Sequence, residues 1–457
     1  MSAASVQLSA NGKRVPPGPK GLPVVGVSFE LLGDALTLLR RMAREYGDIV
    51  RIPVAFGERI LLNHPDWIEQ LLVIQQNKFH KSTLSKEATE RLLGQGLLIS
   101  EGEFWRRQRR LAQPAFHRTR INEYAATMVE IAEAHLAEWR SGEVRDVAHE
   151  MMSLTLDIAV RTLFGTTLPG EAEQVGRAVS FLMRYSLGRA RSPVAIPASW
   201  PTPRNRRADR EYELLDAIVY RIISERRAQG NSAQHTDLLS LLMGAMDEDG
   251  TQMTPKQLRD EIMTLFLAGH ETTALTLSWT WYLLGENPPA EARLHEELRG
   301  VLGGRTAGVA DLEKLPYLQA VISESMRLYP PAYLLARTSI APCNFGGYDF
   351  PTGTTVLASP WVMHRDPRYF DDPDAFRPER WLDGLAGRLP ACAYFPFGDG
   401  PRRCIGQSFA LMESALVLAT VAQKFRFRLV PGHPVTPEPL VTLRPKHGIR
   451  MTFEARR

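Results

Sequence analysis

The chain carries the decapeptide Phe397-Gly398-Asp399-Gly400-Pro401-Arg402-Arg403-Cys404-Ile405-Gly406, and this stretch decides the fold. It is a bend rich in glycine and arginine that places one thiol, Cys404, just before a run of helical spacing at residues 407–421. A helix N-terminus and two adjacent arginines both favour the thiolate over the thiol. A thiolate held in this way suits the axial position of a heme iron. The local sequence alone also allows a reduced surface cysteine beside a basic turn.

The composition of the chain is that of an ordinary globular protein. It has 457 residues, of which 44% are hydrophobic and 23% are charged, and its net charge of +4 is too small to indicate a nucleic-acid partner. Its three cysteines, Cys343, Cys392 and Cys404, form a poor disulfide framework and suit a reducing compartment. There is no run of about 18 apolar residues, so no transmembrane helix is expected.

The order of local patterns predicts a mostly helical domain with a minor sheet. Alternation over residues 49–62 predicts a hairpin with Gly57 in its turn. Thr254-Pro255 predicts the start of a long helix that ends near Leu284. Residues 332–359 are typical of short strands, whereas four prolines make 188–205 an expected irregular loop between two helices, 171–187 and 206–229.

A second group of chemically active side chains lies in the expected long helix, in Ala268-Gly269-His270-Glu271-Thr272-Thr273. Glycine at mid-helix costs about 1 kcal/mol relative to alanine and leaves a groove where a flat or small molecule can approach. Thr272 and Glu271 add a hydroxyl and a carboxylate to an apolar segment. The local alternative is that Thr272 bonds back to a carbonyl while Glu271 faces solvent. His270 and His364 lack partners at zinc-ligand spacing, and we expect both to be structural.

Two further patterns place charged residues at helical spacing. Glu324 and Arg327 are three residues apart and can pair on one helix face, although an exposed pair would contribute only about 0–1 kcal/mol. Trp105 and Arg109 lie one turn apart, and a guanidinium suits a carboxylate such as a heme propionate. A solvated surface charge is the alternative for each of these arginines.

Taken in order, these segments resemble the cytochrome P-450 family: residues 105–109, 268–273, 324–327, 378–381 and 397–406. With a proline-rich start they cover nearly the whole chain. The resemblance implies a mainly α fold, in which a large helical domain carries a small β-rich subdomain. We expect residues 1–457 to be a single catalytic domain whose segment 1–26 is polar and then proline-rich. Neither a membrane anchor nor a fused reductase is expected.

The resemblance assigns chemical roles to the first two motifs. Cys404 would be the axial ligand of the iron in heme b, Thr272 would hold dioxygen and its waters, and Glu271 would relay protons. Contacts with the heme are implied for Trp105, Arg109, Arg337, Arg402, Phe397, Gly400, Gly406, Ala268 and Gly269, with Lys81 as a weaker candidate. The two glycines of the loop would let the backbone approach a flat macrocycle closely.

The remaining motifs are expected to have structural or specificity roles. Glu324, Arg327 and Arg380, the last from Pro378-Glu379-Arg380-Trp381, would form a buried triad that braces the Cys404 loop. Substrate specificity is expected in the stretches 84–99, 188–205 and 439–443. The candidate pocket residues are Phe266, Leu267, Leu334 and Leu335. Residues 268–273 and 378–381 are most similar to a branch of the family that includes fatty-acid hydroxylases.

The implied activity is that of a heme-thiolate monooxygenase, which inserts one oxygen atom from O2 into a small apolar substrate by hydroxylation or epoxidation. Electrons would come from a ferredoxin or flavodoxin with its NAD(P)H-dependent reductase. The expected docking face carries Arg106, Arg107, Arg110 and Arg403. A peroxide-driven peroxygenase and a non-catalytic heme-thiolate sensor are the alternatives. We expect a cytoplasmic monomer that neither inserts into a membrane nor binds nucleic acid.

Overall fold

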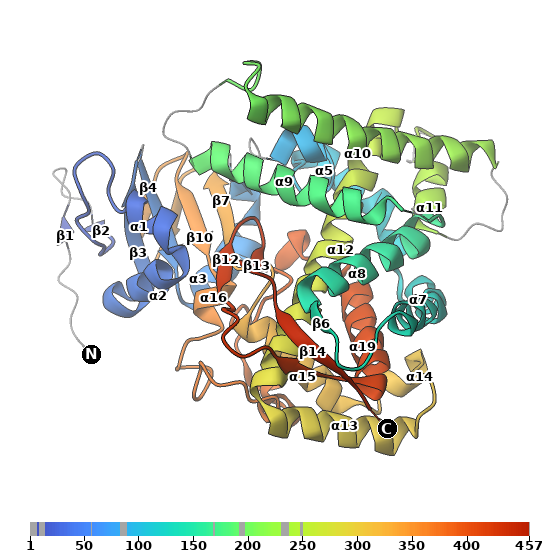
Figure 1. The fold of residues 1–457 in the computed structure, drawn as a ribbon. Coiled ribbons are helices and arrows are strands. Elements are labelled where there is room, and N and C mark those ends of the chain that lie inside the picture. Colours follow the sequence, from blue (N-terminus) through green and yellow to red (C-terminus); the bar gives the residue numbers. More distant parts are fainter. Residues whose placement is uncertain are drawn as a thin grey trace.

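A 32-residue helix, α12 (Pro255–Glu286), runs through the helical part of the computed structural model (Figure 1). A capping box fixes its start: the backbone N of Gln257 donates to Oγ1 of Thr254 at 3.2 Å, and the backbone N of Thr254 donates to Oε1 of Gln257 at 2.8 Å. Pro255 occupies the first helical position, as predicted. The helix ends at Glu286, close to the predicted end.

The structure describes residues 7–8, 14–55, 57–82, 89–167, 170–191, 197–229, 237–246 and 250–456. Besides α12, the helices are α1 (Ser28–Gly33), α2 (Ala35–Tyr46), α3 (Pro65–Glu69), α5 (Gly102–Ala112), α6 (Arg118–Glu123), α7 (Ala125–Ala137), α8 (Val147–Phe164), α9 (Ala172–Arg191), α10 (Pro203–Ala228), α11 (Leu238–Gly244), α13 (Pro288–Leu302), α14 (Val309–Leu312), α15 (Pro316–Leu328), α16 (Pro360–Met363), α17 (Glu379–Leu382), α18 (Leu385–Arg388) and α19 (Gln407–Lys424). Short helical turns are η1 (Gln70–Ile74), η2 (Gln76–Lys78), η3 (Gln113–Phe116) and η4 (Gly400–Arg402).

The largest sheet has five strands in the order β3-β4-β10-β7-β5. Its first two strands form the predicted antiparallel hairpin, with Gly57 at the start of the second strand. A three-stranded sheet has the order β11-β14-β6, and the remaining pairs are β12-β13, β8-β9 and β1-β2. The strands are β1 (Gln7–Leu8), β2 (Arg14–Val15), β3 (Ile49–Val54), β4 (Gly57–Leu62), β5 (Phe79–Lys81), β6 (Val144–Asp146), β7 (Leu335–Ser339), β8 (Cys343–Phe345), β9 (Tyr348–Phe350), β10 (Thr355–Ala358), β11 (Phe425–Leu429), β12 (Pro437–Pro439), β13 (Leu443–Pro445) and β14 (Arg450–Ala455).

The helical and β-rich parts lie side by side, which confirms the predicted mainly α fold (Figure 1). One large apolar core is built around α12, α8, α15 and α19, and two smaller clusters pack on the faces of the five-stranded sheet. Helices α9 and α10 extend across one side of the helical part. Burial of apolar area at about 25 cal/mol per Å² makes this continuous core the main source of stability.

One local prediction needs correction. The irregular connector predicted at residues 188–205 is shorter, because α9 continues to Arg191 and α10 already begins at Pro203. Proline at the first turn of a helix is tolerated, since its missing N–H would have no partner there, and the side chain of Thr202 caps that end by accepting from the backbone N of Asn205 at 3.1 Å. Pro203 therefore begins a helix rather than breaking one.

Candidate active site

The Cys404 loop, residues 397–406, contains the turn η4 and leads directly into helix α19. Backbone hydrogen bonds close the loop: N of Arg403 donates to O of Gly400 at 3.0 Å, and N of Cys404 donates to O of Phe397 at 3.0 Å. Gly400 has φ 68°, and a Cβ there would lie 2.1 Å from the carbonyl oxygen of Leu72 in η1. The packing against η1 therefore requires glycine at position 400, and the contact of Gly400 with a flat cofactor stays a prediction.

The Cys404 thiol is accessible to solvent, although protein atoms surround most of it. Burial raises its pKa, whereas a hydrogen bond from the N–H of Gly406 and the positive charges of Arg109 and Arg403 lower it. Burial is the largest of these effects, so the net pKa is raised. Burial thus opposes the thiolate that the loop sequence is expected to favour. A metal cation bound at the thiol would supply the missing stabilisation, because a metal deprotonates a thiol ligand outright.

Ala268, Gly269 and Thr272 form an opening on one face of α12. Ala268 is exposed and the other two are half-buried, whereas residues 258–267 and 273–281 of the same helix are buried. Oγ1 of Thr272 donates to O of Ala268 at 2.8 Å. This is the bond back to a carbonyl that the local sequence allowed as the alternative for Thr272. The hydroxyl oxygen keeps its lone pairs, so it can still accept a hydrogen bond from a molecule in the opening.

The four candidate pocket residues fall into two groups. Phe266 and Leu267 are each only 3% exposed and belong to the main core, which argues against their contact with a substrate. Leu334 and Leu335 are half-buried, and Cδ1 of Leu335 lies 3.8 Å from the position of a Cβ on Gly398 in the Cys404 loop. Residues 84–88 and 192–196 of the predicted specificity stretches lie outside the described residues.

The Glu271 carboxylate is buried and paired, not exposed to solvent. Its Oε1 accepts hydrogen bonds from Oγ1 of Thr442 and from Nε of Arg444, the latter at 2.9 Å. Nη2 of Arg444 lies 2.7 Å from the same oxygen. These partners lie 171 and 173 residues away in sequence, in the hairpin formed by β12 and β13, which we call the C-terminal hairpin. No local signal could have predicted them, because the contact depends on how the hairpin folds back over α12.

Three cations converge on one carboxylate beside the five-stranded sheet. Lys81 and Arg337 are paired residues of β5 and β7, and Arg402 forms an ion pair with Glu101. Burial and repulsion from Arg402 lower the pKa of Arg337 to about 10, and burial with repulsion from Arg337 and Arg402 lowers the pKa of Lys81 well below its usual value. A dianion would relieve this repulsion, and a heme carries two propionates. The cluster therefore fits the predicted cofactor, with Lys81 as a full member and Glu101 as a residue that the sequence did not reveal.

Trp105 connects this cluster to the thiol. The guanidinium of Arg402 lies 3.9 Å from the centroid of the Trp105 ring, and that of Arg109 lies 5.8 Å from it. Arg109 in turn interacts electrostatically with Cys404. The predicted Trp105–Arg109 pair is therefore brought together, and the cations form a continuous path from the sheet to the Cys404 loop.

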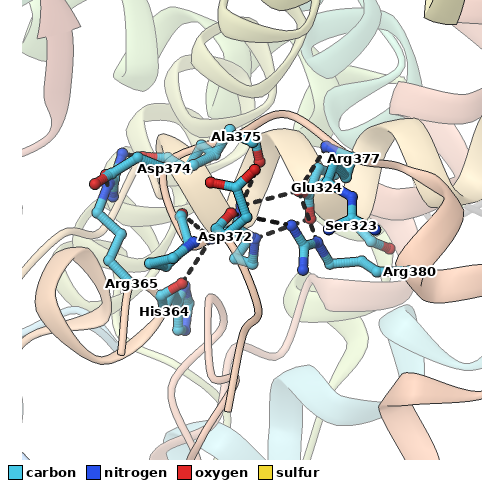
Figure 2. A network of polar contacts seen from close by, with 12 residues as sticks. Ser323, Glu324, His364, Arg365, Asp372, Asp374, Ala375, Arg377 and Arg380 are labelled. Carbon is cyan, nitrogen blue, oxygen red and sulfur yellow. Dashed lines mark hydrogen bonds and ion pairs between the residues drawn. The ribbon is translucent and has the colours of Figure 1, made fainter. Parts of the chain in front are cut away.

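The predicted triad is also brought together, and Figure 2 labels two of its members, Glu324 and Arg380. The carboxylate of Glu324 lies 2.8 Å from Arg327 and 3.0 Å from Arg380, and the first two side chains are fully buried. Glu324 also accepts from Nε1 of Trp381 at 2.8 Å and from the backbone N of Arg377 at 2.9 Å. The exposed helix pair that the spacing alone allowed is therefore excluded.

Both histidines singled out in the sequence have structural partners. Nδ1 of His270 hydrogen bonds to O of Phe266 at 2.7 Å, and Nε2 of His364 accepts from the backbone N of Phe395 at 2.9 Å. Within the described part of the chain, no cluster of three His, Cys, Asp or Glu side chains could hold a metal ion. In the same part, no helix combines the length and hydropathy needed to cross a membrane.

Comparison with known proteins agrees with this geometry. The family described as Cytochrome P450 matches residues 16–453. Cyclooctatin synthase of Streptomyces melanosporofaciens is 38% identical over 93% of this chain and 92% of its own length, and pentalenene oxygenase of Streptomyces avermitilis is 32% identical over 96% and 97%. The solved structure of retinoic-acid-bound cyanobacterial CYP120A1 has a TM-score of 0.85 and 28% identity, and it covers 97% of this chain and 99% of its own.

The fold and these relatives define an oxygenase that depends on heme. The chain belongs to the cytochrome P450 family. It is a monooxygenase that uses heme b and O2, takes electrons from redox partners and acts on an apolar substrate.

Proposed function

We propose that Cys404 ligates the heme iron, and that Lys81, Arg337, Arg402 and Arg109 hold the propionates. The convergence of Lys81, Arg337 and Arg402 on Glu101 within the described residues carries this proposal, because a bound dianion would balance their charge. When bound, the heme supplies the activation of O2 and the oxidation of the substrate. Ala268 and Gly269 leave the opening in α12 free of bulky side chains, which gives a flat ring access to the helix.

Thr272 and Glu271 are assigned to the handling of protons. The Thr272 hydroxyl borders the opening and can hold a water by accepting its hydrogen bond. Glu271 is the next residue along α12, and as a carboxylate it can take up and release a proton. This pair favours O2-dependent turnover over the peroxide-driven alternative, because peroxide enters after the proton-dependent activation of O2.

We infer that the substrate is an apolar terpenoid, the class of compound that cyclooctat-9-en-7-ol 5-monooxygenase and pentalenene oxygenase oxidise. The first of these is 38% identical over 89% of this chain. The test is a spectral titration with pentalenene and, as a matched apolar ligand, a straight-chain fatty acid. We expect the shift of the Soret band that marks displacement of the iron's water with the terpene only. An equal or stronger response to the fatty acid would favour the branch suggested by residues 378–381.

Thr272→Ala should uncouple electron use from product formation. The variant should keep its heme and its substrate affinity, because the hydroxyl lies at the edge of the opening and, among the described residues, bonds to the carbonyl of Ala268 in its own helix. Coupled turnover should fall by about 10²-fold, the lower end of what positioned proton transfer contributes. Product and hydrogen peroxide formed per NAD(P)H are measured together. Thr280→Ala is the control, because its hydroxyl also bonds back along α12, to O of Thr276 at 2.7 Å. Unchanged coupling in Thr272→Ala would remove the residue from the mechanism.

We propose that the electron donor is an acidic ferredoxin or flavodoxin and that it docks near Cys404 on Arg106, Arg110 and Arg403, all of which are exposed. The predicted face also included Arg107, but its Nη2 donates to O of Thr251 at 3.0 Å, in the segment that leads into α12. Arg107 is therefore held against the segment that leads into α12.

Arg110→Glu should slow first-electron transfer from an acidic ferredoxin by about tenfold at low salt, the lower end of the range for electrostatic steering. Arg107→Glu makes the same change of charge on the same helix and should have a much smaller effect. The reduction rate is measured by stopped flow across ionic strength. Equal rates in both variants, with no dependence on salt, would exclude this docking face.

Three free cysteines support our proposal that the protein works in the cytoplasm, where thiols stay reduced. We also propose that it is a monomer, because a heme site built entirely from one chain needs no second copy. Sedimentation velocity of the heme-loaded protein tests this proposal.

A further inference from the structure

The Glu271 carboxylate is held at one of its two oxygens. Oε1 receives every hydrogen bond that the described residues make to it, from Thr442 and from Arg444. Oε2 accepts none from those residues. One oxygen is therefore fixed in place, while the other keeps its lone pairs for a further hydrogen bond.

Arg444 extends this contact to a third element. Its Nη1 donates to Oγ of Ser180 at 3.0 Å, in the middle of α9. A second polar contact joins the same helix to the same hairpin, because Arg184 lies 3.7 Å from Glu438 of β12. The buried guanidinium of Arg444 is thus shared between α9 and the Glu271 carboxylate of α12.

The chemistry of arginine makes this sharing restrictive. The guanidinium is planar and its N–H donors are fixed in one fork, so it cannot turn towards one partner without changing its hydrogen bonds to the other. It is also nearly enclosed by protein, with only 9% of its side chain exposed, and water cannot easily replace a lost partner. A displacement of Ser180 with α9 would therefore alter the hold on Oε1 of Glu271.

We propose that Arg444 is a positioning residue for Glu271, and that it makes proton delivery depend on the position of α9. This inference rests on the proton-transfer role proposed above for Glu271. A substrate that shifts α9 would change the orientation of the Glu271 carboxylate. Proton delivery by Glu271 would then depend on the position that α9 takes when substrate is bound.

The decisive test is a double-mutant cycle on the heme-loaded protein, with Arg444→Met, Glu271→Gln and the double variant. Arg444→Met should lower the product formed per electron by about 2–30-fold, the range expected for residues that couple two sites. The same substitution should have little further effect in the Glu271→Gln background, since it acts through that carboxylate. An undiminished effect of Arg444→Met in that background would overturn the inference.

A structural defect has to be separated from lost positioning. Arg428→Met is the matched control, because Arg428 pairs with a different buried carboxylate, that of Glu291, at 2.9 Å. It should leave coupling at the parent value even if the melting temperature falls. If Arg444→Met loads heme poorly, Arg444→Lys keeps the charge but loses the fork, and we expect it also to lower coupling. Parent-level coupling in Arg444→Lys would contradict the need for the fork.

A second readout is independent of activity. Ser180→Ala removes the contact with α9 but leaves both contacts of Arg444 with Glu271. We expect faster amide hydrogen exchange in residues 176–184 of α9, together with a smaller loss of coupling than in Arg444→Met. Exchange identical to the parent in both Ser180→Ala and Arg444→Met would show that Arg444 does not hold α9. If Glu271→Gln alone leaves coupling intact, it is the proposed role of Glu271 that fails.

Discussion

Replacing Cys404 by histidine or alanine should abolish monooxygenase activity. The thiolate donates electron density to the iron and thereby favours O–O cleavage, which neither replacement can do to the same degree. The loop is closed by backbone hydrogen bonds, such as that from N of Cys404 to O of Phe397 at 3.0 Å, so a change of side chain leaves its shape intact. We therefore expect loss of function without loss of fold.

The measurement is the spectrum of the reduced, CO-bound protein together with product formation. The parent should show the long-wavelength Soret band of thiolate ligation, and Cys404→His should show the shorter-wavelength band of imidazole ligation. Cys343→Ala is the control, since that cysteine lies buried in the core of the β-rich part. A parent protein that shows only the shorter-wavelength band would refute Cys404 as the ligand.

Some features of the fold could be predicted from the sequence and others could not. The separation along the chain between the contacting residues explains this difference. The spacing of Glu324 and Arg327 placed both on one helix face, and the structure confirms their contact at 2.8 Å. The capped start of α12 was predicted for the same reason, because Thr254 and Pro255 act on the next turn of the chain. Patterns within about one helical turn are thus readable from the chain itself.

Contacts between distant segments could not be derived in this way. The link from Glu271 to Arg444 spans 173 residues, and the clash that requires glycine at position 400 comes from the carbonyl of Leu72. The effect of burial on Cys404 was also not predictable from local sequence. Its pKa is raised because burial by the surrounding protein outweighs the effect of the neighbouring cations. The number of protein atoms around a side chain is a property of the whole fold.

The triad is connected to the Cys404 loop by a short series of hydrogen bonds. Nη1 of Arg327 donates to the carbonyl of His364 at 2.8 Å, and the ring of His364 accepts from the backbone N of Phe395. The carbonyl of Phe395 then accepts from N of Gly398 at 2.9 Å, at the start of the loop. This series gives a physical basis for the predicted bracing role, because a shift of Arg327 would be passed to the backbone that presents Cys404.

Glu324→Gln and Arg327→Ala should therefore yield poorly folded protein that binds little heme. Arg327 uses all five of its N–H donors, two towards Glu324 and three towards the carbonyls of His364, Pro373 and Ala375. Its removal strands a buried carboxylate, which costs about 3–5 kcal/mol. In Glu324→Gln an amide NH2 would face N–H donors where an oxygen now accepts, so even this isosteric change should be severe.

Heme content per protein and the melting temperature measure these effects. Arg293→Ala is the matched control, because Arg293 pairs with Glu379 at 3.1 Å while both side chains are about half exposed. Loss of such an exposed pair costs only about 0–1 kcal/mol, so heme loading should stay at the parent level. Destabilisation by Arg327→Ala that is no larger than that of the control would mean that the triad does not brace the loop. A large loss of both heme and stability in the Glu324 and Arg327 variants, but not in Arg293→Ala, would establish that the buried triad holds the Cys404 loop in place.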